Sequence, residues 1–237
     1  MKILYIFPHP DDESFGPATT IAKLKREDHH VYLLTLTKGG ATKQRHKFNF
    51  SVEEMGEARH KEMLKVVEVL GIDGFKILDL PDSGLKELDP HIIEEEIKSH
   101  IEIIKPDVII TYPVHGVSGF HDHLVCHAAV KRVYCELKEN GNNYLKRLAF
   151  FTIDEAVAKE MSTVHKLQFS QKDEIDCILK VSEEDKEKNR QSLDCYVTYK
   201  EMIDNTGVRK HIPDHVSFEF FRENYNPPVN DIFADLN

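Results

Sequence analysis

A histidine followed closely by acidic residues is the first feature of this sequence that could do chemistry. The run His9-Pro10-Asp11-Asp12-Glu13 follows a short apolar stretch. In a tight turn, His9 and Asp12 can both reach one cation, while Asp11 points elsewhere and can hold a water beside that cation. Zinc suits such a set, because it accepts imidazole nitrogen and carboxylate oxygen and keeps one position open for water. The same acids could instead cap a helix and favour its positive dipole end, and composition alone leaves both readings open.

A second polar run contains two more histidines. It follows an apolar stretch at residues 107–111 and reads Ser118-Gly119-Phe120-His121-Asp122-His123. A histidine from this run would complete a two-histidine, one-carboxylate metal site with His9 and Asp12. Asp122 would then cap the following helix or orient an imidazole. A single histidine is ordinarily a surface residue or a satisfied core group, but two runs in matching positions favour a site.

The hydrophobic pattern predicts alternating strands and helices that would position these runs. Apolar stretches of strand length occur at residues 3–7, 30–37, 75–80, 107–111, 148–153 and 175–181. Helical patterns lie at residues 17–25, 51–71, 89–104, 123–137 and 183–203, and the tail after them is unassigned. This order predicts an α/β, Rossmann-like fold with a mostly parallel sheet and helices on both faces.

Such a fold would bring the two polar runs to one edge. Ligands of open parallel sheets bind beyond the carboxyl ends of the strands. Both runs follow predicted strands, so they meet if the first and fourth strands are neighbours. The sequence has no internal repeat or convincing linker, and we expect residues 1–237 to form a single domain.

Composition removes several functional classes. The chain has 237 residues, a net charge of -10 and dispersed basic residues, which argues against a nucleic-acid partner. No stretch approaches the length of a membrane span, and the N-terminal apolar run is too short for a signal sequence. The 4 cysteines form no C-x-x-C pair, which favours a reducing compartment. We therefore expect a cytoplasmic protein.

The first run and several later segments resemble the LmbE-like (PIG-L) family of zinc-dependent N-acetylglucosaminyl de-N-acetylases. The resemblance covers roughly the first 140 residues, and the first run is its most specific part. The other matching segments are Thr35-Leu36-Thr37-Lys38-Gly39, Arg59 with Glu62, Leu80-Pro81-Asp82 and Asp122-His123.

The resemblance implies a set of roles in metal-assisted amide hydrolysis. His9, Asp12 and His123 would bind Zn²⁺, and Asp11 would be the general base. The family's second motif typically reads His-Pro-Asp-His, and its first histidine stabilises the oxyanion or assists the leaving group. This chain has Phe120-His121 at the first two positions, so that role falls to His121, displaced by one residue, or to His115.

Two further residues are implied to bind substrate. Arg59 lies on the apolar side of its predicted helix and would contact a substrate hydroxyl, or it would pack there and pair with Glu62. Asp82 would be a second polar contact, or simply a turn residue in Pro-Asp-Ser-Gly. His127 is expected to be structural, and the run at residues 211–215 is expected to be a decoy or part of a pocket rim.

These features favour a zinc-dependent hydrolase that removes acetyl from an N-acetylglucosamine-type small molecule. One alternative is a metal-dependent phosphohydrolase that uses the adjacent His121-Asp122 pair, although the usual scaffold for that motif is all-helical. Another is a non-catalytic metal-binding domain on a Rossmann-like scaffold. Members of the family often form trimers or hexamers, so the resemblance also implies a homo-oligomer.

Overall fold

A seven-stranded sheet runs through the centre of the computed structural model, which describes residues 1–161 and 166–236. From one edge to the other the strands are β3 (Gly74–Leu80), β2 (His30–Thr37), β1 (Lys2–Phe7), β4 (Val108–Thr111), β5 (Arg147–Thr152), β7 (His215–Phe220) and β6 (Cys177–Lys180). Neighbouring strands from β3 to β5 are parallel, whereas β7 is antiparallel to β5 and to β6. The predicted mostly parallel sheet is confirmed.

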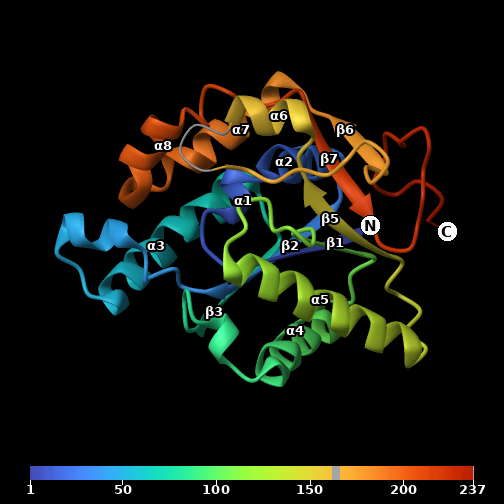
Figure 1. Cartoon of the computed structure of the whole chain (residues 1–237), viewed down its shortest axis with the longest axis horizontal. Coiled ribbons are helices and arrows are strands. Elements are labelled where there is room, and N and C mark those ends of the chain that lie inside the picture. The colour runs from blue at the N-terminus through green and yellow to red at the C-terminus, as the bar shows by residue number, and fades with distance from the viewer. Residues whose placement is uncertain (162–165, 237) are drawn as a thin grey trace.

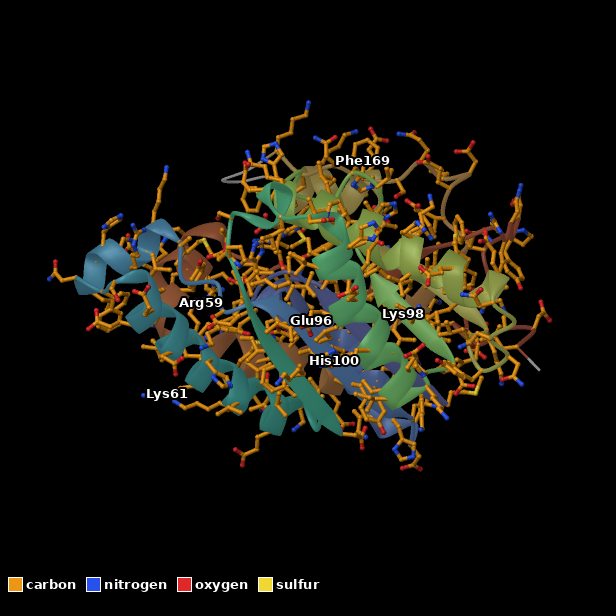
Figure 2. The ribbon with its side chains drawn as sticks, turned by 90° about the horizontal axis from the view of Figure 1, so that it is seen from below. Arg59, Lys61, Glu96, Lys98, His100 and Phe169 are labelled. Atoms are coloured by element: carbon orange, nitrogen blue, oxygen red, sulfur yellow. The ribbon has the colours of Figure 1, made fainter. Side chains whose placement is uncertain are left out.

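Helices cover both faces of this sheet (Figure 1). One face packs against α2 (Ala18–Arg26), α3 (Val52–Leu70) and α7 (Glu183–Asp194), and the other against α4 (Pro90–Ile104) and α5 (His121–Glu139). Figure 2, seen from below, shows how α3 is sided: Arg59 lies toward the body of the molecule and Lys61 points away from it. The α/β class predicted from the hydrophobic pattern is therefore confirmed.

The helix boundaries follow the signals in the sequence. Ser51 and Glu54 form a reciprocal capping box at the start of α3, and Gly71 ends that helix with a φ of 67°. Asp89 caps α4, whose first residue is a proline that needs no hydrogen-bond partner for its nitrogen. These local signals are why the ends of both helices were predictable.

The pairing of β1 with β4 decides where a site can form. Ile3 pairs with Val108 and Tyr5 pairs with Ile110 in parallel register. The chain runs outward from β1 through β2 to β3 and then crosses to the other side of β1 to form β4. This reversal of strand order leaves a crevice beyond the carboxyl ends of β1 and β4, where ligands bind in sheets of this kind.

The C-terminal region differs from the prediction. The single helix expected at residues 183–203 is broken into α7, a 3-10 turn and α8 (Lys200–Thr206), because Tyr196 leaves the helical conformation to bury its ring. The unassigned tail contains β7, which adds an antiparallel strand beside β5. The short helices α1 (Asp12–Phe15) and α6 (Glu155–Met161) and the 3-10 segments Lys43–Phe48, Leu85–Glu87 and Val197–Tyr199 also escaped the sequence analysis.

No helix within residues 1–161 and 166–236 is both long and apolar enough to cross a bilayer. The chain's cysteines, Cys126, Cys135, Cys177 and Cys195, are all free thiols.

One buried arginine ties the C-terminal segment to the sheet. Arg147, at the start of β5, donates to Glu223 through Nε at 2.8 Å and through Nη2 at 2.5 Å. It also donates to the carbonyl oxygens of Ile232 at 2.5 Å and Ala234 at 2.9 Å. The fork geometry of a guanidinium suits such multiple acceptors. The last residues are thereby held against the edge of the sheet that carries β7 and β6.

Replacing this arginine by a side chain of similar bulk is expected to destabilise the fold. Arg147→Met should lower the free energy of unfolding by about 2–4 kcal/mol, since Glu223 and the two carbonyls lose their donor. Urea denaturation followed by circular dichroism measures the change. Arg132→Met is the matched control, because Arg132 is exposed and pairs loosely with its helical neighbour Glu136, at 3.7 Å. Equal stability of the two variants would contradict the assignment.

Candidate active site

The turn after β1 and the first turn of α5 meet at the carboxyl edge of the sheet. The turn carries His9 and leads into α1, which begins at Asp12, and α5 carries His123. Ligand atoms of these three residues all lie within 4.8 Å of one another. The parallel pairing of β1 with β4 brings His123 to His9 and Asp12, although His123 lies more than a hundred residues further along the chain.

Hydrogen bonds orient the imidazole of His9. Its Nε2 faces a carboxylate oxygen of Asp122 at 3.2 Å and one of Asp82 at 3.3 Å. A proton on Nε2 leaves Nδ1 as the nitrogen with a free lone pair, and Nδ1 lies 3.5 Å from Asp12 Oδ2. The backbone N–H of His9 donates to the same Asp12 oxygen at 2.8 Å, which closes the turn. Carboxylate partners of this kind fix the tautomer of a metal-binding histidine.

His123 is oriented in the same way from the other side. Its Nδ1 donates to the carbonyl oxygen of Gly116 at 2.9 Å, so Nε2 carries the free lone pair. That Nε2 lies 3.3 Å from Asp12 Oδ1. The ring stacks on Tyr112 with centroids 4.1 Å apart and planes 13° apart, and the Tyr112 hydroxyl donates to Asp12 Oδ1 at 2.8 Å. Both free nitrogens thus face one carboxylate.

Asp82 and Asp122 act as supports for His9 in this geometry. Asp122 accepts the backbone N–H groups of Ser83 and Leu85, and Asp82 accepts that of Ala41 at 2.7 Å. These bonds occupy oxygens that a metal would otherwise use. Of the two readings of Asp122, orientation of an imidazole is observed, whereas the N-cap position of α5 belongs to Phe120.

The donor set fits a zinc-type cation. Two imidazole nitrogens with free lone pairs and one carboxylate converge, and each of them is held by further hydrogen bonds. Burial opposes ionisation of Asp12, but the two imidazoles, chiefly His123, hold its pKa well below the usual range. A buried carboxylate that faces an imidazole nitrogen on each side is the arrangement that a divalent cation completes.

Asp11 lies beside this cluster and is held by Arg59. The Arg59 guanidinium donates to Asp11 Oδ2 at 2.7 Å, to the Gly39 carbonyl at 2.9 Å and to the Pro10 carbonyl. Asp11 has a φ of 88°, a left-handed conformation that is strained for a residue with a side chain. Its backbone N–H donates to the Tyr196 hydroxyl at 2.8 Å. The strained turn directs the Asp11 carboxylate away from the metal ligands and onto the arginine.

The surroundings of Asp11 suit a group that exchanges protons. Burial raises the pKa of Asp11 to about 8, while the charge of Arg59 opposes that shift. Neighbouring Asp12 remains ionised, so two adjacent carboxylates differ in proton affinity because their environments differ.

The partner of Arg59 differs from one of the two interpretations of the sequence, in which Arg59 pairs with Glu62. Its side chain is 2% exposed on α3, as expected for the apolar side, but its head pairs with Asp11 instead of Glu62. Glu62 accepts the backbone N–H of Thr198 at 2.8 Å and its hydroxyl at 2.7 Å. The guanidinium also lies 4.3 Å from the ring centre of Tyr199. The prediction of a substrate hydroxyl contact for Arg59 stays a prediction.

The two candidates for proton transfer from the second run lie elsewhere. His121 is exposed at the start of α5 and is not among the described residues that line the cavity. His115 accepts from Val117 N at 3.1 Å and faces the Ser170 hydroxyl at 3.2 Å, and burial lowers its pKa. Phe120 lines the cavity and packs edge-on against the His123 ring.

Three tyrosines contact the site and were missed by sequence reasoning. Tyr112 directly follows β4, so its position at a strand end was a usable signal. Tyr196 and Tyr199 come from the segment between α7 and α8, more than a hundred residues after Arg59. Tyr196 also donates to Glu13 Oε1 at 2.7 Å. No local sequence pattern predicts contacts between residues so far apart in the chain.

One cavity of about 600 Å³ opens onto the site. Its lining includes the predicted residues His9, Asp11, Asp12, Arg59, Asp82 and His123. His211 and His215 also line it, so the run at residues 211–215 contributes to the pocket wall, one of the two outcomes expected. His127 instead donates to the Tyr112 carbonyl at 2.9 Å, a structural contact.

The comparison with known families agrees with this geometry. The profile of the PIG-L family, described as GlcNAc-PI de-N-acetylase, matches residues 4–134, which is more than half of the chain. The chain belongs to the PIG-L family. The matched range contains every residue predicted to bind metal or to act as base, and it ends before β5.

Two relatives and one solved structure extend the comparison of this PIG-L chain. It is 31% identical over 142 residues to N-acetylglucosaminyl-phosphatidylinositol de-N-acetylase of Bos taurus, covering 58% of this chain and 52% of that protein. It is 31% identical over 141 residues to probable N-acetyl-alpha-D-glucosaminyl L-malate deacetylase 2 of Bacillus subtilis (strain 168), covering 58% and 63%. The zinc-inhibited form of teicoplanin deacetylase Orf2 has the same fold, with a TM-score of 0.71, 14% identity and coverage of 94% and 99%. The chain thus spans little more than half of the curated relatives' length.

Loss of either histidine ligand is expected to empty the metal site. His9→Ala and His123→Ala should reduce bound zinc from about one ion per chain to near zero, since two protein donors cannot retain it. Elemental analysis of purified, zinc-exposed protein measures the content. His121→Ala is the matched control and should keep its metal. Full zinc content in either ligand variant, with circular dichroism unchanged, would contradict the site.

The supports of His9 should tune metal affinity without abolishing it. Asp122→Asn removes the charge that holds the His9 Nε2 proton, and zinc affinity should fall about 10–100-fold. Competition with a chromogenic chelator gives the dissociation constant. Asp79→Asn, which alters an exposed carboxylate at the end of β3, is the control. An unchanged affinity in Asp122→Asn would refute the role of this residue.

Proposed function

We propose that this PIG-L chain is a zinc-dependent hydrolase that removes the acetyl group from an N-acetylglucosamine-type substrate. One observation carries the proposal: Asp11 is held by Arg59 beside a two-histidine, one-carboxylate cluster, and both face the same cavity. Amide hydrolysis needs a base next to a metal-activated water that does not itself occupy the metal. The names of the relatives supply the class of substrate.

Each step of the reaction has a residue in place. A zinc ion bound by His9, Asp12 and His123 would polarise the acetyl carbonyl and lower the pKa of water. Asp11 accepts the proton of the attacking water as the water oxygen bonds to the carbonyl carbon. Arg59 keeps the Asp11 carboxylate in position for that transfer. When the C–N bond breaks, Asp11 returns the proton to the departing nitrogen, and acetic acid and the free amine are released.

We assign both proton transfers to Asp11 because the other candidates are badly placed. His121 is exposed outside the lining, and His115 is turned toward Ser170 with a lowered pKa. Asp11 lies in the cavity, and its raised pKa allows it to carry a proton near neutral pH. Asp82, also in the lining, is the residue we assign to a substrate hydroxyl, while Arg59 acts through Asp11.

The charges around the cluster argue against the phosphohydrolase alternative. Asp11, Asp12 and Asp82 line the cavity together, and the guanidinium of Arg59 is already occupied by Asp11. A phosphate ester would bring further negative charge against these carboxylates, whereas an acetamide is neutral. A neutral acetamide can therefore bind beside these carboxylates without a further cation, whereas a phosphate ester would need one to offset its charge.

The proposal extends to the whole chain and to its surroundings. Residues after 150, including Tyr199 and His215, line the same cavity as the metal cluster, which supports treating residues 1–237 as one catalytic domain. Free thiols and the small-molecule substrate class are consistent with a cytoplasmic location. Homo-oligomer formation stays an expectation from the resemblance.

Removing the base should separate metal binding from catalysis. Asp11→Asn should lower the rate of amine release from N-acetylglucosaminides by about 10²–10⁴-fold, the usual contribution of a positioned base, while zinc content stays at the wild-type level. Fluorescamine detection of the free amine gives the rate. Asp79→Asn should keep both rate and zinc.

Two results would overturn the proposal. Full amine release by Asp11→Asn would refute the assigned base. Hydrolysis of phosphate esters by the zinc-loaded wild-type protein, without amine release from any N-acetylglucosaminide, would favour the phosphohydrolase reading instead.

A further inference from the structure

The cavity continues beyond the metal cluster into a region with an apolar wall. This apolar extension is formed by Val157, Met161, Met202, Val208, Ile212 and Val216. These side chains come from α6, from α8 and the turn after it, and from the start of β7. Figure 1 shows α6 above the end of β5, on the side of the sheet where α7 and α8 also lie.

Sheet order places the extension at a definite side of the site. The metal cluster lies at the ends of β1 and β4, and β5 and β7 are the next strands across the sheet. Thr152, at the end of β5, pairs with Ser217 of β7, and both line the cavity. A ligand held with its acetamide at the metal can therefore continue past β5 along the carboxyl edge toward the extension.

Two pairs of polar side chains at this end of the cavity face each other. His215 Nε2 lies 2.8 Å from Asp154, and His211 Nδ1 lies 3.1 Å from Glu160. A polar or charged ligand group placed among the valines and methionines would give up water without gaining equivalent hydrogen bonds. An alkyl or aryl group would gain free energy in proportion to the apolar area that it buries there.

We propose that the apolar extension binds the aglycone of the substrate, and that this aglycone is an alkyl or aryl group. The inference rests on the proposed function for the amino-sugar half of the ligand. The volume of about 600 Å³ lies in the range that encloses a drug-sized molecule, and one wall holds the metal cluster while another is apolar. Zinc and Asp11 would then give specificity for the acetamide, and the apolar extension would give specificity for the aglycone attached to the sugar.

Kinetics on two glycosides test the proposal. The wild-type, zinc-loaded protein should release amine from hexyl N-acetylglucosaminide with kcat/KM about tenfold or more above that for the methyl glycoside. Met202→Gln and Ile212→Asn should each bring the hexyl-to-methyl ratio down toward one. Leu64→Gln alters an exposed leucine on α3, outside the lining, and should leave the ratio unchanged. A wild-type ratio near one would overturn the inference.

A binding measurement separates this inference from the proposed function. Calorimetry on zinc-loaded Asp11→Asn should give a dissociation constant at least about tenfold lower for the hexyl than for the methyl glycoside. Tighter hexyl binding without amine release by wild type would refute the deacetylase proposal and keep the apolar subsite. Amine release with equal binding of the hexyl and methyl glycosides would support the deacetylase proposal and refute the apolar subsite. Tighter binding of a polar glycoside, such as an inositol or malate conjugate, than of the hexyl glycoside would also refute the apolar subsite.

Discussion

The buried carboxylate of Asp12 is the group on which the rest of the site depends. It is 5% exposed and ionised, and it accepts hydrogen bonds from the His9 backbone and the Tyr112 hydroxyl while facing an imidazole nitrogen on each side. A buried negative charge is costly unless a positive partner and hydrogen bonds compensate it. Only the adjacency of β1 and β4 brings these groups to one point. The topology of the sheet and the chemistry of the site are therefore one constraint.

Separate hydrogen-bond donors and cationic partners explain why several carboxylates lie close together here. Asp82 and Asp122 are stabilised by backbone N–H groups and by the His9 ring, and Asp11 by Arg59. The negative charge of each of these three acids is thus offset by its own partners. The space between His9, Asp12 and His123 is where a further positive charge, that of a metal ion, would be most favourable. Differences in these partners, rather than in residue type, are what separate the proposed ligand Asp12 and the proposed base Asp11 from the supporting Asp82 and Asp122.

Sequence reasoning succeeded where the determining interactions are local. The turn after β1, the capping box of α3 and the proline start of α4 are each set by a few adjacent residues. It failed where a distant contact decides the conformation. Tyr196 breaks the helix expected at residues 183–203 because its hydroxyl reaches Glu13 and the Asp11 backbone. The partner of Arg59 was likewise Asp11, 48 residues away, and not Glu62 on the same helix.

The parts of the cavity that the sequence predicted and the parts that it did not predict have different proposed roles. The segment matched by the PIG-L profile, residues 4–134, carries the proposed metal ligands, the proposed base Asp11 and Arg59. The apolar extension comes from residues beyond that range, in α6, α8 and β7. A pocket wall is specified by shape and apolar area, which many sequences satisfy, whereas a metal site needs particular donors at particular spacings. The proposed reaction can therefore be predicted from a sequence motif. The proposed substrate preference depends on a cavity wall that forms only when α6, α8 and β7 pack beside the metal cluster.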